Sequence, residues 1–558
     1  MPGTWAALAN QPSFSAGTML LLTDGTVMCQ DSDKPHWWRL TPDGTGSYVN
    51  GTWSQLADSS NGPLYFASAV LRDGRVFVAG GEYNNGNVVV DLLAAEIYDP
   101  VANKWVSIST PPGWTHIGDA SCCVLPDGRV LIGSIDDNRC AIYDPIANSW
   151  SAAGSKHNRT SNEETWTLLP DQTVMTVDCA GAPQTEKFVI ALNQWSLSGN
   201  TPTNLVESSS IEIGPAVLLP DGRLFAIGAT GQTALYTPPP VSAQLGSWAQ
   251  GPVFPPQAAG QTLGAKDAPA CLMPNGLVLC AAGPVDGVSG HYLTPTYFFE
   301  FNPATNTLTP APNPPTNGGP PYLGRLMLLP TGQALFANGS NNMQVYTPSG
   351  SPDPVWKPTI TSAPTTVQIG STHVLAGRQI NGLSQAVSYG DDATMATNYP
   401  IVRIHNDTTG HITYCRTFNH STLGVNTGTV IHTTEFTVPA GTPLGASHLT
   451  VVANGIASDP VPVNIVIIKL KEAKELKHEV KELEVAASGV ADDTVGSGLM
   501  RVIAQLAQRL DDMAAGAEQN GQRPFIRASE RPRVGIDIDV GQPTLPPSRP
   551  RSQRPQEA

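Results

Sequence analysis

A short apolar strand, a tight turn of the Asp-Gly type and a second apolar strand recur seven times along this chain. The turn glycines, with glutamine in one exceptional unit, follow one another at intervals of 44 to 56 residues. They are Gly25, Gly74, Gly128, Gln172, Gly222, Gly276 and Gly332. Asp-Gly and Asn-Gly supply the positive φ angles of a tight hairpin, and the flanking Val, Leu and Phe suit a pleated sheet. A strand repeat of about fifty residues predicts a β-propeller.

The rest of each unit supplies two more strands. Most units continue with an aromatic segment that ends before proline, such as EIYDP at 96–100, and several then place a tryptophan a few residues later, such as Trp105. The seventh unit lacks this last strand, whereas the segment 3–8 resembles one without a blade of its own. We therefore expect the N-terminal segment to close the ring by pairing into the last blade, which removes two exposed sheet edges.

The sequence predicts an all-β protein with four successive regions. Residues 1–350 form the seven-bladed propeller, and the short alternating strands of residues 351–466 predict an immunoglobulin-like β-sandwich. Residues 467–515 carry apolar side chains at helical spacing, which predicts amphipathic or coiled-coil helices. These helices either lie on the sandwich or mediate self-association or docking to an assembly. Residues 516–558 are rich in Pro, Arg and Gln and are expected to be disordered.

Charge and composition exclude several classes of binding partner. The net charge of −15 argues against nucleic acid and anionic membranes, and no apolar run reaches the length of a membrane span. The first fourteen residues resemble no signal peptide, which predicts a cytoplasmic protein by default. The eight cysteines lack metal-ligand spacing, and several fall on inner-strand positions, so we expect buried free thiols.

Seven kelch-like blades followed by a domain that opens with KPTI at 357–360 form a familiar arrangement. Over residues 1 to 466 the chain resembles the galactose oxidase and glyoxal oxidase family of copper-radical enzymes, which are mostly secreted. The resemblance is strongest in VLRDGRVFVAGG at 70–81, in LLPTGQALFANG at 328–339 and in the segment 399–428.

The resemblance implies a copper ion held near the propeller axis by two tyrosines and two histidines, one tyrosine being thioether-linked to a cysteine. Tyr65 matches the cross-linked tyrosine and Tyr322 the axial one, while His420 is the candidate for the histidine from a sandwich loop. Ala16 stands where the cysteine is expected and Leu323 where one histidine is expected. Too few nitrogen donors remain for the family's copper geometry. We expect the oxidase activity to be lost, and we assign no catalytic residue.

The turn glycines also give a register for the innermost strand of each blade, because the position nine residues earlier should face the axis in every blade. Around the ring these positions are Ala16, Tyr65, Asp119, Glu163, Ile213, Asp267 and Leu323. Three are carboxylates, which repel one another unless they are paired, hydrated or bridged by a cation. Adding nearby polar residues, the sequence predicts a ligand-binding set at the channel mouth: Tyr65, His116, Asp119, Glu163, Asp267, Tyr322 and Arg325.

Several functions fit this mouth. The first is binding of a carbohydrate, another small molecule or a protein partner without chemistry. The second is a metal-dependent oxidoreductase of the resembled superfamily, with a rebuilt centre of Tyr65, Tyr322, His420 and nearby carboxylates. The carboxylates with His116 or His420 could also hold calcium or act as an acid/base pair on a sugar. The remaining alternative is a hydrated channel lining held by internal salt bridges.

Overall fold

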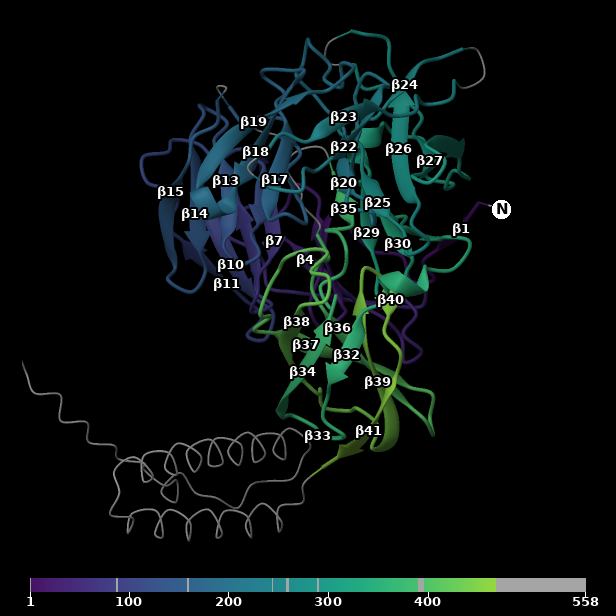
Figure 1. The fold of residues 1–558 in the computed structure, drawn as a ribbon. Helices are drawn as coiled ribbons and strands as arrows, with labels where there is room; N and C mark the ends of the chain where they lie inside the picture. The colour runs from purple at the N-terminus through teal and green to yellow at the C-terminus, as the bar shows by residue number, and fades with distance from the viewer. Residues whose placement is uncertain are drawn as a thin grey trace, which may run out of the picture.

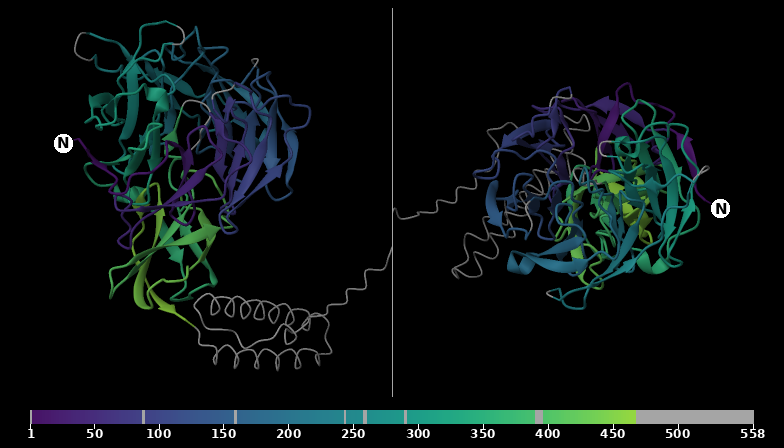
Figure 2. Two further views of the ribbon diagram at one scale, coloured as in Figure 1. Left: turned by 180° about the vertical axis from the view of Figure 1, so that it is seen from behind. Right: turned by 90° about the horizontal axis from the view of Figure 1, so that it is seen from above.

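Seven four-stranded antiparallel units dominate the structure and confirm the predicted seven-bladed propeller (Figure 1). This computed structural model describes residues 2–86, 89–157, 160–242, 244–256, 260–288, 291–389 and 396–467. The predicted helices and the predicted disordered tail lie outside these residues from 468 onwards. Seen from above (Figure 2, right), the blades form a ring, and the green and yellow strands of the C-terminal unit, which lie below it in Figure 1, are seen through its middle.

In every blade the first of the four strands is innermost and the last is outermost. Blades 1 and 2 are β2 (Ala16–Leu21), β3 (Val27–Asp31), β4 (Trp37–Thr41) and β5 (Thr52–Gln55), then β7 (Ala67–Val70), β8 (Val76–Ala79), β10 (Ala95–Asp99) and β11 (Lys104–Ile108). Blades 3 and 4 are β12 (Cys122–Val124), β13 (Val130–Gly133), β14 (Cys140–Asp144) and β15 (Ser149–Ala153), then β16 (Thr167–Leu168), β17 (Thr173–Val177), β18 (Gln184–Val189) and β19 (Gln194–Asn200).

The remaining blades follow the same order. Blade 5 is β20 (Ala216–Leu218), β21 (Leu224–Ile227), β22 (Thr233–Thr237) and β23 (Ser247–Gln250). Blade 6 is β25 (Ala270–Leu272), β26 (Val278–Pro284), β27 (Tyr297–Asn302) and β28 (Thr307–Pro310), and blade 7 is β29 (Arg325–Leu328), β30 (Ala334–Ala337), β31 (Gln344–Thr347) and β1 (Thr4–Ala7). Short extra elements are β6 (Pro63–Leu64), β9 (Tyr83–Asn84), β24 (Leu263–Gly264) and the 3₁₀ turns η1 (Ile190–Leu192), η2 (Pro321–Leu323) and η3 (Pro354–Trp356).

The hairpin between the first two strands of each blade forms for the reason that the sequence suggested. Six turn glycines have φ between 75° and 91°, and Gln172 adopts a φ of 61° at the equivalent place. The residue before the glycine locks the turn with its side chain, as where Asp73 Oδ1 accepts a hydrogen bond of 3.0 Å from the Arg75 backbone N–H. Such local bonds stabilise the turn conformation.

The outer half of the blade is held by an aromatic ladder. The aromatic residue of the third strand pairs directly with the tryptophan of the fourth, as Tyr98 does with Trp105 and Tyr143 with Trp150. Their ring centroids lie 5.2 and 5.1 Å apart. Cross-strand aromatic pairs of this kind add stability beyond their buried area.

The ring closes through its two sequence ends. The N-terminal strand β1 pairs antiparallel with β31, which places Trp5 opposite Tyr346. The first strands of neighbouring blades contact one another all round, and β2 of blade 1 contacts β29 of blade 7. The last blade is therefore built from both ends of the propeller sequence, and β1 pairs with what would otherwise be the open edge of β31.

A nine-stranded sheet with its own apolar core follows the propeller and lies below it in Figure 1. Its strands are β32 (Thr359–Ser362), β33 (Thr366–Gln368), β34 (Thr372–Arg378), β36 (Ile401–Asn406), β37 (Ile412–Phe418), β38 (Ile431–Thr437), β39 (Gly445–Ala453), β40 (Ile456–Ala457) and β41 (Val461–Val466). An immunoglobulin-like topology for this unit stays a prediction.

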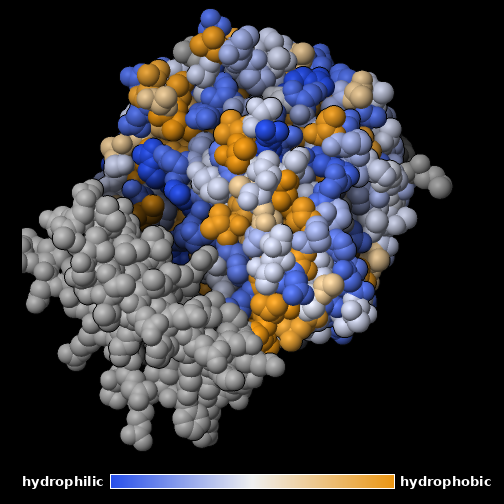
Figure 3. Space-filling view, turned by 60° about the horizontal axis from the view of Figure 1, so that its bottom comes forward, coloured by the Kyte–Doolittle hydropathy of each residue, from blue (hydrophilic) through white to orange (hydrophobic). Residues whose placement is uncertain are grey.

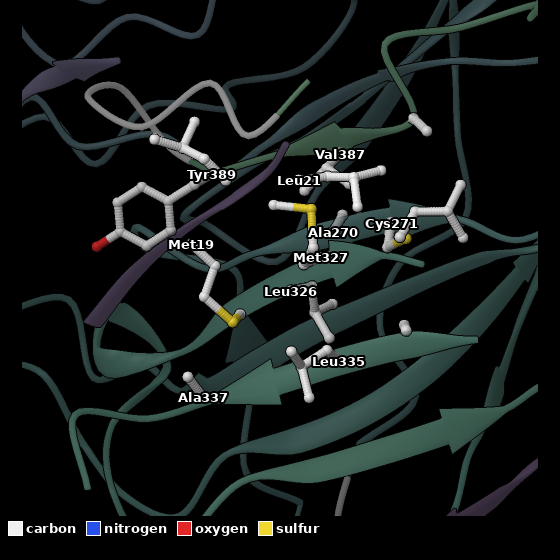
Figure 4. Packing of buried hydrophobic residues seen from close by; sticks show 14 of the residues in the cluster. Met19, Leu21, Ala270, Cys271, Leu326, Met327, Leu335, Ala337, Val387 and Tyr389 are labelled. Carbon is white, nitrogen blue, oxygen red and sulfur yellow. The ribbon is translucent and has the colours of Figure 1, made fainter. Parts of the chain in front are cut away.

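One segment of the C-terminal unit enters the middle of the propeller. The two-residue strand β35 (Val387–Ser388) pairs with β25, the innermost strand of blade 6. Further along the ring, the Gln385 side chain accepts a hydrogen bond of 2.8 Å from the Leu168 backbone N–H. Figure 4 shows Val387 and Tyr389 beside apolar side chains of the inner strands, such as Leu21. The segment 383–389 therefore plugs the channel from within.

The surface and the interior differ in their hydrophobicity. On the face shown in Figure 3, hydrophobic residues form small patches broken by hydrophilic ones, whereas three buried clusters hold most of the large apolar side chains. All eight cysteines are buried free thiols, as predicted. In the part of the chain that the structure describes, no helix combines the length and the apolar character needed to cross a membrane.

Candidate functional site

The channel mouth is formed by residues that stand just before the innermost strands. Tyr65 precedes β7 by two residues, and Asp119, Glu163 and Asp267 precede β12, β16 and β25 by three or four. Because equivalent strands run parallel to the same axis in every blade, residues before them gather at one end of the channel. These four residues line a cavity of about 420 Å³, together with Glu212 before β20, Tyr322 before β29 and other residues.

The cavity is lined almost wholly by tyrosines and carboxylates. The lining residues are Leu64, Tyr65, Glu82, Tyr83, Asp119, Glu163, Glu212, Asp267, Tyr292, Tyr322 and Tyr389. Five are tyrosines and five are acidic. Such a lining offers flat rings for stacking, hydroxyl donors and many oxygen acceptors.

The backbone is unusual at three of these positions. Tyr65, Glu163 and Asp267 have φ values of 53°, 61° and 45°, in the left-handed region that side chains rarely adopt. Each such residue costs about 1–3 kcal/mol and persists only where the surrounding structure holds it in place. Strain of this kind collects at functional sites, and here it falls on three equivalent positions of the repeat.

Tyr292 connects two of the carboxylates. Its hydroxyl donates a hydrogen bond to Glu212 Oε1 and lies 3.4 Å from Asp267 Oδ2. Burial and then the charges of Asp267 and Glu212 raise the pKa of Tyr292 far above its ordinary value. Tyr292 therefore stays a neutral hydrogen-bond donor throughout the physiological range.

Lys266 places one positive charge behind the cavity wall. Its ammonium lies 4.3 Å from the ring centroid of Tyr292, a cation–π arrangement, and 3.7 Å from Glu207 Oε2. Burial disfavours the charged form of Glu207, but hydrogen bonds from Ser209 and Ser210 outweigh it and lower the pKa of Glu207 to about 2. Lys266 and Glu207 thus form a charged pair beside the cavity.

Arg325 supports the tyrosines from behind. It is only 4% exposed, and its guanidinium carbon lies 3.6 Å from the ring centroid of Tyr389 and 5.7 Å from that of Tyr65. Its Nη1 donates to the backbone carbonyl of Tyr322 at 2.7 Å, and the Tyr389 hydroxyl donates to the same oxygen. Arg325 therefore fixes the positions of three lining tyrosines without itself lining the cavity.

The structure brings together five of the sequence-predicted mouth residues: Tyr65, Asp119, Glu163, Asp267 and Tyr322. It places His116 outside the cavity lining, where the exposed imidazole pairs with Asp136 at 3.1 Å. His116 lies in the loop before β12, three residues upstream of Asp119 and therefore outside the register that brings Asp119 to the cavity.

His420 lies near the opposite end of the inner strands. Its backbone N–H donates to the carbonyl of Arg72, in the hairpin turn at the far end of β7 from Tyr65. Its ring is 1% exposed, stacks against Tyr399 and meets the Thr434 hydroxyl at 2.9 Å. The structure therefore does not bring His420 into the cavity with Tyr65 and Tyr322, because the loop that carries it packs under the propeller.

The copper centre implied by the resemblance does not fit the described residues. Tyr65 and Tyr322 do line one cavity, but no histidine or cysteine is found among the eleven residues of its lining. Ala16 is buried at the start of β2, where a thioether would need a cysteine. An all-oxygen lining favours hard cations or hydroxylated ligands over copper.

Sequence reasoning missed several lining residues. In blade 5 the register pointed to Ile213, yet Ile213 is buried and Glu212 lines the cavity. Glu212 also pairs with Glu207 in an isolated bridge just before the strand. Tyr292 comes from a long loop of blade 6 and Tyr389 from the plug, so only their tertiary packing reveals them.

Comparisons with known proteins add distant likenesses. No protein-family model and no curated protein sequence matches the chain. Among solved structures, a fungal alcohol oxidase of the AA5 family in complex with copper is 13% identical with a TM-score of 0.47, over 84% of this chain and 99% of that one. The extracellular domain of a proposed one-component system from B. thetaiotaomicron is 10% identical with a TM-score of 0.38, over 82% of this chain and 56% of that one. The propeller fold itself rests on this chain's own strand pairing.

Proposed function

We propose that the chain is a binding protein that takes a neutral saccharide, or a similar polyhydroxylated molecule, in the cavity at the propeller mouth. The observation that carries this proposal is the lining of five tyrosines and five carboxylates around a volume of about 420 Å³. That volume lies within the usual range of small-molecule sites. Tyrosine rings stack on the apolar faces of sugar rings, and carboxylates accept hydrogen bonds from their hydroxyl groups.

The charge of the lining predicts which saccharides are excluded. Five acidic residues face one cavity, while the nearby cations Lys266 and Arg325 lie behind its wall. An anionic sugar would be repelled by the carboxylates and would find no cation among the described residues that line the cavity. We therefore expect neutral or amino sugars to bind better than uronic or sialic acids of the same size.

Binding is tested on an array of neutral and acidic glycans, followed by calorimetry with the strongest neutral hit. Tyr83→Ala removes a half-buried ring of the lining and should weaken binding at least tenfold. Tyr297→Ala makes the same change on β27 outside the lining and should leave the affinity within about twofold. Binding of acidic glycans alone, or equal losses in both variants, would contradict the proposal.

Oxidase chemistry is tested on the same preparation. We propose that the chain does not catalyse copper-radical oxidation, because the residues described around Tyr65 and Tyr322 supply no nitrogen or sulfur ligand. Protein reconstituted with copper should release no peroxide from alcohols or aldehydes above the level of free copper. Stoichiometric copper with steady peroxide release would overturn this part of the proposal.

A further inference from the structure

Three carboxylate side chains from consecutive blades converge in the wall of the cavity. Glu163 precedes the inner strand of blade 4, Glu212 that of blade 5 and Asp267 that of blade 6. One carboxylate oxygen of each lies within 4.8 Å of the corresponding oxygens of the other two. We call these residues the carboxylate trio. Carboxylates held at such distances repel one another unless a proton or a cation lies between them.

The spacing of the trio matches the coordination sphere of calcium. Bonds from Ca²⁺ to protein oxygens are about 2.3–2.6 Å, so two ligands on opposite sides of one ion stand about 4.6–5.2 Å apart. Ligands at smaller angles stand closer together. Oxygens that all lie within 4.8 Å of one another can therefore contact a single ion without large movements of the backbone.

Glu212 supplies an independent sign that a ligand is needed. The residue is only 7% exposed, and its Oε1 accepts the hydrogen bond from the Tyr292 hydroxyl. Its second oxygen, Oε2, is buried and has no hydrogen-bond partner among the described residues. A buried carboxylate oxygen without a partner is costly, and this one belongs to a side chain that lines the cavity.

The nearest lysine is engaged elsewhere. The ammonium of Lys266 lies 3.7 Å from Glu207, a carboxylate outside the trio, and packs over the ring of Tyr292. Glu207 is held ionised by its hydrogen bonds from Ser209 and Ser210. Glu207 therefore largely neutralises the positive charge of Lys266, so little of that charge is left to offset the repulsion within the trio.

We propose that Glu163, Glu212 and Asp267 bind one Ca²⁺ ion in the cavity wall, with Tyr292 orienting Glu212 and water completing the coordination. Oxygen ligands from flexible carboxylates, with open space on one side, suit calcium better than the smaller and geometrically stricter magnesium. The proposal goes beyond saccharide binding and does not depend on it, because the three carboxylates alone supply the protein ligands.

Calcium binding is measured on the full chain by calorimetry with CaCl₂, after treatment with EGTA and desalting. Terbium luminescence gives a second readout, because Tb³⁺ replaces Ca²⁺ and is excited by nearby tyrosine rings. We expect one saturable site, with terbium emission excited through tyrosine and displaced by calcium. Wild-type protein with no saturable calcium site would overturn the proposal.

Two matched variants locate the ion. Glu212→Gln removes one charge from the trio and should weaken calcium binding at least tenfold, whereas Glu82→Gln removes one charge from the same cavity outside the trio and should weaken it less than threefold. Equal losses in the two variants would mean a diffuse electrostatic effect and would overturn the site. If Glu212→Gln does not fold, Asp267→Asn replaces it, with the same tenfold loss expected and retained affinity counting against the proposal.

Discussion

The inner strands of the propeller have two very different ends. At the hairpin end, the C-terminal unit satisfies the backbone of the blades: the Tyr399 hydroxyl donates to the carbonyl of Leu21, and the Leu423 N–H donates to that of Pro126 at 2.8 Å. At the mouth end, strained residues and acidic side chains surround open space.

This difference separates stability from binding within one repeat. Polar groups that are buried and paired hold a fold together, whereas polar groups that are strained or incompletely paired lower its stability and are retained where a ligand completes them. Changes at the hairpin end should therefore alter unfolding, and changes at the mouth end should alter binding or even stabilise the ligand-free protein.

The largest effect should come from acidifying the hairpin end. Burial, and then the charges of Arg72 and Arg416, lower the pKa of His420 to about 3, whereas an unfolded histidine titrates near 6.5. Between these values the unfolded chain binds a proton that the folded chain does not. This residue therefore makes the free energy of unfolding fall as pH drops from about 6.5 to about 3, by up to about 1.4 kcal/mol per pH unit.

The pH effect is checked by urea unfolding of wild type and His420→Asn at pH 7, 6, 5 and 4. The difference in unfolding free energy between the two proteins should shift in favour of the variant as pH falls. Parallel pH profiles would mean that the pKa of His420 is not lowered by folding and that its imidazole is in contact with water.

Asn454 should show the next largest effect, because it anchors the start of the plug. Its Oδ1 accepts from the backbone N–H groups of Leu383 and Ser384, and its Nδ2 donates to the Ser384 carbonyl. Asn454→Ala leaves these buried groups unpaired and should lower the free energy of unfolding by about 3 kcal/mol. Thermal unfolding measures the loss, and Asn426→Ala, at another loop asparagine with positive φ, serves as the control.

Removing a charge at the mouth should act in the opposite direction. In calcium-free buffer with EGTA, Glu212→Gln relieves repulsion within the carboxylate trio and should raise the free energy of unfolding by about 1 kcal/mol. Urea unfolding of both proteins measures the change. A destabilised variant would show that Glu212 serves the fold in the same way as the residues of the hairpin end.

The smallest effect is expected where the plug reaches the mouth. Tyr389→Phe removes the hydroxyl that donates to the Tyr322 carbonyl at 2.7 Å, while the packing of the ring on Arg325 remains. We expect a loss of about 0.5–1 kcal/mol in unfolding free energy and little change in saccharide affinity. A large drop in affinity would instead make this hydroxyl part of the binding surface.

The repeat made the propeller and much of the cavity lining predictable from the sequence. Turn glycines mark the hairpins because only certain residues tolerate a positive φ there, and counting back from them located Tyr65, Asp119, Glu163 and Asp267. The register is a local property of one blade, so it fails where a loop changes length, as before Ile213 in blade 5.

Contacts between segments that are distant in the sequence could not be predicted from the spacing of the turn glycines. Tyr292 lies in a long loop, and Tyr389 reaches the cavity only because the segment before it pairs with blade 6. His420 resembled a metal ligand by its sequence neighbourhood, but the depth at which its loop docks is set by the contact between the two units. No periodic pattern reports that depth.

The pairing of β35 with β25 also bears on how the molecule is made. During synthesis, β1 cannot pair until β31 has been made, so blade 7 is completed late. The inner edge of blade 6 likewise has no partner until residue 388 has left the ribosome. The plug therefore becomes available only after every strand of the blades has been made. A gene cut at the predicted boundary near residue 350 would therefore remove the strand that pairs with the inner edge of blade 6.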